Sequence, residues 1–162
     1  MTLMAETVTE SAPGFYLMRT DRGFVVHMCA CAEHLQRLRD MTGTTLKLAG
    51  VGQEAVESAQ LVASELVGNA VRACGDLVPL VVELGAEKSC VSVKVHDPEP
   101  NRMPRRRLTA LDDEDAETGR GFGLIDLLSP GWQTRITPVG KQIICRVPAT
   151  DPCTTNATTV KE

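Results

Sequence analysis

Glu65, Asn69 and Arg72 are polar residues whose spacing places them on one face of a helix. Side chains four positions apart in a helix differ in direction by about 40°, and those seven apart by about 20°. A carboxylate can accept a proton, an amide oxygen can bind a metal ion, and a guanidinium can contact an anion. Gly68 lies among them, although glycine destabilises a helix by about 1 kcal/mol relative to alanine. A second molecule that approaches the backbone at this point would explain the glycine. Alternatively, the three polar residues are an ordinary solvated face of the helix.

Two further signals follow along the chain. Asp97 ends an apolar stretch with strand character, and a glycine-rich run over residues 119–123 precedes an apolar segment typical of a helix. Glycines at a helix start let backbone amides approach a phosphate, and the helix N-terminus favours anions. A glycine run alone is weak evidence, and Asp97 could instead simply begin the turn before Pro98. The run consists of Gly119, Arg120, Gly121, Phe122 and Gly123.

A long helix must hold the polar trio, and we expect it from Gln53 to Gly75. Gly75 is a typical residue just beyond a helix C-terminus. Apolar residues recur in this segment at the spacing of a buried stripe on another face. The stripe consists of Val56, Ala59, Ala63, Leu66, Ala70 and Cys74.

Short runs of β-branched and alternating apolar residues predict strands on both sides of this helix. The expected strands cover residues 24–31, 80–84, 90–95, 132–138 and 142–147. A first helix is expected from Ala32 through Met41 and could continue to about residue 50, although Thr42–Gly43–Thr44–Thr45 weakens its middle. A short helix follows residue 123. This order predicts an α+β fold, a two-layer sandwich of a mostly antiparallel sheet and helices.

We expect one domain over residues 15–148. Residues 1–14 are polar without periodicity and predict a disordered arm, and residues 149–162 predict a disordered, Thr-rich tail. Residues 98–118 contain three prolines beside a basic and an acidic run, which predicts a flexible functional loop. The chain lacks the βαβ pattern of a dinucleotide-binding fold and the GxxxxGK[ST] sequence of a P-loop.

The net charge of −4 argues against direct binding to nucleic acid, which requires a surplus of Lys and Arg. No apolar run approaches the roughly 20 residues that cross a membrane. The N-terminus lacks the basic and apolar regions of a signal peptide, so we expect a cytoplasmic protein.

Six cysteines occur without a CxxC pair, so structural thiols are favoured over a zinc site or disulfides. Cys29 and Cys31 are two positions apart on a predicted strand and should point to the same side. The six are Cys29, Cys31, Cys74, Cys90, Cys145 and Cys153.

The sequences ELVGNAV, VKVHD and GRGFG, ending at Val71, Asp97 and Gly123, together resemble the ATP-binding boxes of the GHKL (Bergerat-fold) superfamily. The most similar branch is the single-domain serine-kinase anti-sigma factors, and the resemblance covers roughly residues 51–147. It implies a Bergerat ATP-binding fold over residues 15–148, with residues 98–118 as the ATP lid. The implied cofactors are ATP and Mg²⁺.

The resemblance also implies roles for single residues. It assigns Asn69 to Mg²⁺, Glu65 to the catalytic base, and Asp97 to the exocyclic amino group of adenine. Arg72 would add positive charge nearby, although a structural ion pair is equally open. Lys141 lies near the place where family members have a small polar residue beside the base, and no firm role follows for it. The cofactor-binding candidates are Asn69, Arg72, Asp97, Gly119, Arg120, Gly121, Phe122, Gly123 and Lys141.

The run Asp97–Pro98–Glu99–Pro100 departs from the family pattern Asp-x-Gly-x-Gly. Two prolines restrict the backbone here, and a carboxylate near polyphosphate would repel it. We therefore expect weakened rather than abolished nucleotide binding.

The first functional hypothesis is a protein of the anti-sigma-factor serine/threonine kinase type. It would hold a sigma factor or similar regulatory protein and phosphorylate a Ser or Thr of an anti-anti-sigma-type antagonist. The alternative is a catalytically weak or inactive nucleotide-sensing adaptor that acts by protein–protein binding alone. A homodimer is possible for either, with neither nucleic acid nor membrane as a partner. A histidine kinase fragment is disfavoured, since no dimerisation helix with an exposed phospho-acceptor His precedes the boxes.

Overall fold

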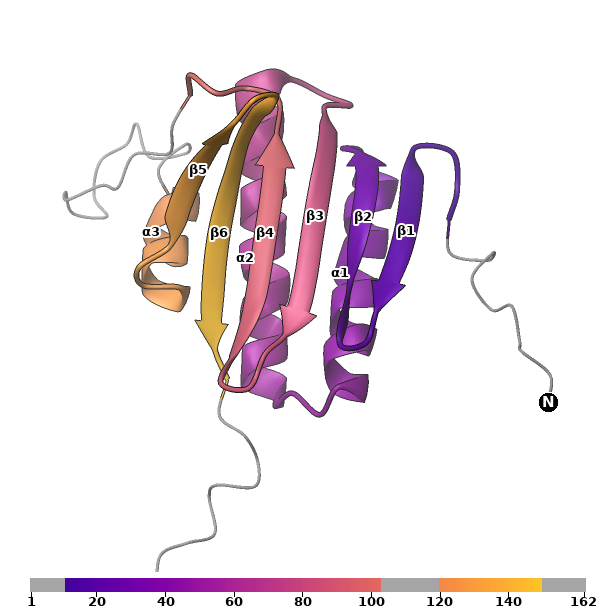
Figure 1. Cartoon of the computed structure of the whole chain (residues 1–162), viewed down its shortest axis with the longest axis vertical. Helices are drawn as coiled ribbons and strands as arrows, with labels where there is room; N and C mark the ends of the chain where they lie inside the picture. The colour runs from indigo at the N-terminus through magenta and orange to yellow at the C-terminus, as the bar shows by residue number, and fades with distance from the viewer. Residues whose placement is uncertain (1–10, 103–119, 150–162) are drawn as a thin grey trace, which may run out of the picture.

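The computed structural model describes residues 11–102 and 120–149 of the chain. In this part, six strands form one sheet in the order β1-β2-β3-β4-β6-β5, and every neighbouring pair is antiparallel (Figure 1). The strands are β1 (Phe15–Thr20), β2 (Gly23–Cys29), β3 (Pro79–Ala86), β4 (Cys90–Asp97), β5 (Gln133–Thr137) and β6 (Gly140–Pro148). The helices are α1 (Ala32–Leu48), α2 (Gln53–Cys74) and α3 (Arg120–Leu128).

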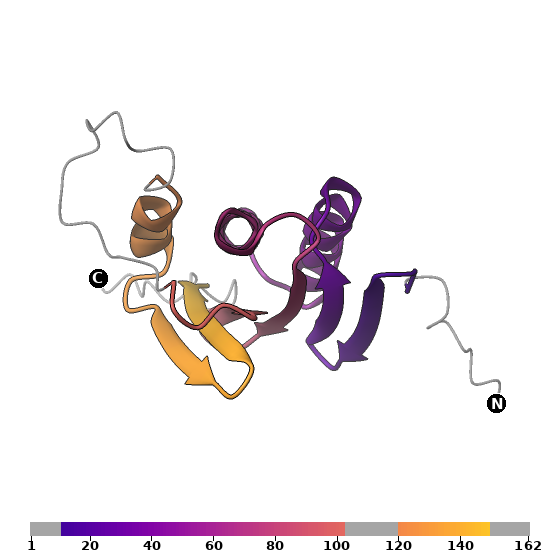
Figure 2. The ribbon, with the colours of Figure 1, turned by 90° about the horizontal axis from the view of Figure 1, so that it is seen from above.

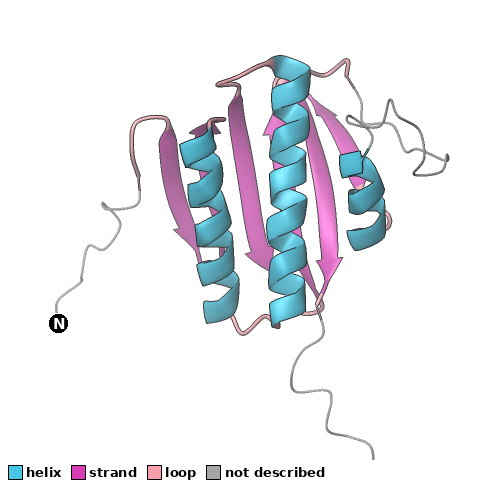
Figure 3. Cartoon of the chain, turned by 180° about the vertical axis from the view of Figure 1, so that it is seen from behind, coloured by secondary structure: helices cyan, strands magenta, loops and turns pink. Residues whose placement is uncertain are grey.

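The three helices lie on one side of the sheet (Figure 2), with α2 between α1 and α3 (Figure 3). The predicted α+β sandwich is therefore confirmed. Apolar side chains of the covered sheet face and of α2 form the core, in which Val62, Val91 and Val93 have no exposed surface.

The structure corrects the N-terminal part of the prediction. Strand β1 was not expected, because Tyr16 and Met18 are largely exposed and the segment lacks a clear apolar–polar alternation. The strand predicted over residues 24–31 ends at Cys29. Cys31 instead caps α1, where its Sγ accepts a hydrogen bond from the backbone N–H of His34 at 3.5 Å. The two cysteines therefore do not share a strand.

Helix α1 continues through the threonine-rich segment to Leu48. The Oγ1 of Thr42 donates to the carbonyl of Leu38 at 2.7 Å, so the buried hydroxyl is satisfied within the helix. A Cβ on Gly43 would lie 2.8 Å from Nε2 of Gln60 in α2. These small residues therefore let the two helices approach closely, and the contact between helices outweighs the weak local propensity.

The row of apolar side chains on one face of strand β4 ends at a charged residue, Asp97. Val91, Val93 and Val95 alternate on the face that α2 covers. Because successive side chains of a strand point to opposite faces, Asp97 continues this row at the end of the strand. It is buried, with an exposed fraction of 2%. The end of β4 thus holds a carboxylate on the helix side of the sheet.

Gly140 lets the turn between β5 and β6 pack on the backbone of Asp97. Its φ is 146°, and a Cβ would lie 1.9 Å from the carbonyl oxygen of Asp97. Gly140→Ala must therefore push the turn away from β4. We expect it to lower the free energy of unfolding by about 3 kcal/mol, measured by urea denaturation.

Gly50→Ala is the matched control for this substitution. Gly50 also has a positive φ, 80°, but nothing lies within 4 Å of the place that its Cβ would take. It should cost only about 1 kcal/mol, the strain of the backbone alone. Equal losses in the two variants would contradict a role for close contact at Gly140.

The described cysteines are free thiols, and one of them predicts a pH dependence of stability. Burial in β6 raises the pKa of Cys145 from 9.0 to about 11, an effect that a hydrogen bond with Ser129 partly opposes. Between these values the unfolded chain loses the thiol proton while the folded chain keeps it. The stabilisation is therefore complete below pH 9 and is lost as the pH rises towards 11.

We expect the free energy of unfolding to fall over this pH range by about 2 kcal/mol more in the unsubstituted protein than in Cys145→Ala. Urea denaturation at several pH values measures both. The cavity left by Ala lowers stability equally at every pH, so only the slopes matter. Parallel slopes would contradict the assignment.

None of the described helices is both long and apolar enough to span a bilayer.

Candidate functional site

One side of α2 carries the predicted carboxylate and amide towards α3. Ser58 and Glu65 are seven positions apart and share one direction on the helix, and Asn69 lies one turn further on. Ser58 lines a hollow together with Leu127 and Leu128 of α3. The strip that continues from it to Glu65 and Asn69 therefore faces α3, and both of these residues are partly buried.

Asn69 is already in contact with a cation in this structure. A guanidinium nitrogen of Arg72, Nη2, donates a hydrogen bond to Oδ1 of Asn69. A Cβ on Gly68 would lie 3.4 Å from Nη1 of Arg72, so the group that approaches the backbone at Gly68 is this guanidinium. The Nδ2 atom of Asn69 is buried and has no hydrogen-bond partner in the described part of the chain. One half of the amide is thus paired and the other half is not.

Asp97 and Lys141 form a buried ion pair at the end of β4 and the start of β6. The two residues lie opposite each other in the sheet register. Nζ of Lys141 lies 3.0 Å from Oδ1 of Asp97, and both side chains are only 3% exposed. Two charges in such a place are stable only as a pair, because each would cost several kcal/mol without the other.

Glu99 takes part in this arrangement mainly through its backbone. Its N–H donates to Oδ1 of Asp97 at 2.9 Å, and its carbonyl accepts from Nζ of Lys141 at 2.7 Å. Its carboxylate accepts from the N–H of Asn101 at 2.8 Å. The segment that departs from the Asp-x-Gly-x-Gly pattern therefore forms a compact turn around the ion pair, and Glu99 satisfies its own carboxylate locally.

The C-terminal end of α2 lies close to this ion pair. Burial raises the pKa of the Cys74 thiol, and the charge of Asp97 raises it further. Lys141 lowers the same pKa, which places the thiol within electrostatic reach of both partners. Cys74 itself is only half-buried, so it lies at the margin of the predicted apolar stripe.

The glycine-rich run is described only in part. Helix α3 begins at Arg120, so Gly121 and Gly123 belong to its first turn. Gly123 is exposed, and nothing lies within 4 Å of where its Cβ would be. Gly119 and residues 103–118 of the predicted lid lie outside the described residues, as do the side chains of Arg120 and Phe122.

These groups come from segments distant in the sequence but close to one end of the molecule. The C-terminal half of α2, the end of β4 and the start of β6 meet there, and α3 begins beside that half of α2 (Figures 1 and 3). The arrangement offers a carboxylate and an amide from α2, an Asp–Lys pair from the sheet, and the N–H groups of a helix start, which have no partner within the helix. It suits an elongated anion that has a polar ring at one end.

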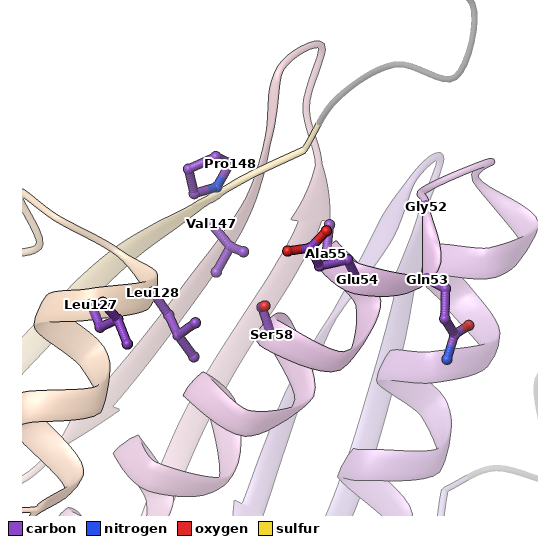
Figure 4. Close-up of a pocket in the computed structure, with 9 residues that line it drawn as sticks. All are labelled: Gly52, Gln53, Glu54, Ala55, Ser58, Leu127, Leu128, Val147 and Pro148. Carbon is purple, nitrogen blue, oxygen red and sulfur yellow. The ribbon is translucent and has the colours of Figure 1, made fainter. Parts of the chain in front are cut away.

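A hollow of about 430 Å³ lies at the opposite end of α2 (Figure 4). The start of α2 and the end of α3 line it together with Val147 and Pro148 of β6. None of the predicted site residues belongs to this hollow.

The sequence model of the histidine kinase-like ATPase domain matches residues 28–147. The chain belongs to this family. The match confirms the GHKL-type superfamily expected from the three boxes, and the anti-sigma-factor branch stays a prediction. No curated protein matches the chain.

The residues of this histidine kinase-like ATPase domain fit ATP and Mg²⁺. Oδ1 of Asn69 attracts a cation already, since it accepts from the Arg72 guanidinium, and an amide oxygen is a ligand that Mg²⁺ accepts. No group of three or more His, Cys, Asp or Glu residues capable of holding a metal occurs in residues 11–102 and 120–149. A Mg²⁺ ion here would therefore take waters and phosphate oxygens as its other ligands.

Sequence reasoning missed the connection between Asp97, Lys141 and Glu99. The signal was present, because Asp97 ends one predicted strand and Lys141 precedes another. Only the strand register brings the two side chains together.

Proposed function

We propose that this ATPase-family chain binds Mg·ATP at the end of the sheet where Asp97 and Lys141 meet. We further propose that it acts as a regulatory protein of the anti-sigma-factor serine/threonine kinase type. It would hold a partner such as a sigma factor, and it would phosphorylate a Ser or Thr of an antagonist protein. Membership of the histidine kinase-like ATPase family supports the binding of ATP. The observation that carries the proposal is the position of Glu65 and Asn69 on the side of α2 that faces α3.

Each residue has a role in this proposal. Oδ1 of Asn69 holds Mg²⁺, and Asp97 accepts a hydrogen bond from the exocyclic amino group of the base. The N–H groups in the first turn of α3, which have no partner within the helix, bind phosphate oxygens. Bound Mg²⁺ neutralises negative charge on the phosphates. A metal on Oδ1 of Asn69 would take the place of the Arg72 guanidinium, which would then be available to contact phosphate.

Glu65 performs the proton transfer. A carboxylate oxygen of Glu65 takes the proton from the Ser or Thr hydroxyl of the antagonist as the hydroxyl oxygen attacks the γ-phosphorus of ATP. The bond from that phosphorus to the β,γ-bridging oxygen breaks in the same step, and ADP leaves. The half-buried side chain accepts no hydrogen bond from another described residue. Its lone pairs are therefore available to a substrate hydroxyl.

Incubation with ATP labelled at the γ-phosphate tests this function. We expect label to appear on Ser or Thr of a candidate antagonist domain, to depend on Mg²⁺, and to be absent for Glu65→Ala. Binding of Mg·ATP without transfer to any candidate would contradict the kinase.

The second candidate is a nucleotide-sensing adaptor without phosphoryl transfer. Two contacts favour it: Arg72 occupies Oδ1 of Asn69, and Lys141 occupies Oδ1 of Asp97. Both polar groups needed for the nucleotide are thus partly paired within the protein, which lowers its affinity. Calorimetry and labelled ATP together separate the candidates. Heat of binding with Mg·ATP but no transfer of label supports the nucleotide-sensing adaptor, and no heat of binding supports an adaptor that acts through protein contacts alone.

A further inference from the structure

Lys141 is held more firmly than a lysine at a protein surface. Its side chain is 3% exposed. Lys141 is the second residue of β6 and follows Gly140, which packs against the backbone of Asp97. An ammonium group has three hydrogens to donate and no acceptor. Oδ1 of Asp97 and the carbonyl of Glu99 take two of these hydrogens, at 3.0 and 2.7 Å. The tetrahedral ammonium group therefore directs its third N–H along a defined line.

Asp97 has one carboxylate oxygen that accepts no hydrogen bond from the described residues. Its hydrogen bonds within the described part of the chain, from Lys141 and from the N–H of Glu99, both end on Oδ1. Oδ2 therefore accepts no hydrogen bond from a described residue, and it belongs to the same carboxylate whose Oδ1 lies 3.0 Å from Nζ of Lys141. The end of the sheet thus presents one acceptor and one donor side by side, in an order fixed by the strand register.

We propose that Lys141 is a specificity-determining residue that donates a hydrogen bond to N1 of adenine. Oδ2 of Asp97 accepts from the exocyclic amino group of the same base. This inference rests on the proposed binding of ATP and adds the residue that selects the base.

The chemistry of the purine edge explains the selection. Adenine carries a donor at its 6-amino group next to an acceptor at N1. A 6-oxopurine such as guanine carries an acceptor at O6 next to a donor at N1, so in the same orientation both atoms would face a like group. A buried donor left without its acceptor is costly, which makes such a site reject the wrong base strongly.

Calorimetric titration of the full chain with ADP, 1-deaza-ADP and GDP, each with Mg²⁺, tests the inference without turnover. In 1-deaza-ADP a C–H replaces N1 and the 6-amino group is kept. We expect 1-deaza-ADP to bind about 10- to 100-fold more weakly than ADP, and GDP to bind more weakly still. In Lys141→Met, ADP should lose affinity until it matches 1-deaza-ADP. Lys88→Met, an exposed lysine in the turn between β3 and β4, should leave all three affinities unchanged.

If Lys141→Met fails to fold, the unsubstituted protein still tests whether N1 of the base accepts a hydrogen bond. Equal affinities for ADP and 1-deaza-ADP would overturn the role of Lys141 while leaving the proposed function intact. GDP binding as tightly as ADP would overturn it as well, because Asp97 and Lys141 would then not discriminate against a 6-oxopurine. Failure of ADP itself to bind would remove the proposed function together with this inference.

Discussion

Asp97→Asn is expected to weaken Mg·ATP binding by about 100-fold or more. The amide oxygen of Asn can still accept from Lys141 and from the N–H of Glu99, as Oδ1 of Asp97 does. The amide nitrogen then replaces Oδ2 and presents a donor to the exocyclic amino group of adenine, which is itself a donor. Calorimetry measures the loss of affinity.

The same substitution removes the negative partner of a buried ammonium. Both side chains of the ion pair are 3% exposed, so the substitution leaves a buried lysine without its counter-ion. We expect the free energy of unfolding to fall by about 3 kcal/mol, measured by urea denaturation. Asp76→Asn is the matched control, because Asp76 is exposed in the turn after α2. An Asp97→Asn variant with unchanged affinity for ATP would contradict the assignment of Asp97 to the base.

Glu65→Gln is expected to separate catalysis from binding. Gln has nearly the same shape as Glu but cannot take a proton, so Mg·ATP affinity should stay within about twofold while phosphoryl transfer falls by about 10²- to 10⁴-fold. Transfer of labelled phosphate and calorimetry on the same preparation measure the two quantities.

Glu57→Gln provides the control on the same helix. The carboxylate of Glu57 is exposed and accepts a hydrogen bond from Gln53 at 2.7 Å, one turn earlier in α2. This variant should transfer phosphate at the normal rate. If Glu65→Gln also kept the normal rate, Glu65 would not be the base.

The long helix could be predicted from the sequence because its signal is local and repeated. Val56, Ala59, Ala63, Leu66 and Ala70 are all buried, as their spacing predicts. Gly75 follows the last residue of α2 with a φ of 94°, and its N–H bonds to the carbonyl of Val71. The end of β4 was equally readable, since alternating valines lead directly to Asp97.

Strand β1 was not predictable in the same way. It lies at the edge of the sheet and pairs only with β2, and four of its six residues are exposed, so its apolar pattern is weak. The length of helix α1 was harder to predict for a different reason. The sequence correctly shows a weak helix propensity in its middle, but the contact with α2 at Gly43 overrides that propensity.

The contacts within the site are also of two kinds, those between residues close in the sequence and those that depend on how the strands pair. The bond between Asn69 and Arg72 joins residues three positions apart in one helix, and such pairs follow from helical spacing. The bond between Asp97 and Lys141 joins residues 44 positions apart and depends on the register of β4 with β6. No local pattern contains that register, and so the residue that completes the site had no assigned role.

A crystal structure of the chain with Mg²⁺ and a non-hydrolysable ATP analogue tests the central claim most directly. We predict Mg²⁺ on Oδ1 of Asn69 with Arg72 displaced from that atom, the phosphates at the start of α3, and the 6-amino group on Oδ2 of Asp97. A nucleotide bound elsewhere, for example in the hollow at the start of α2, or one bound here with Arg72 still on Asn69, would contradict it.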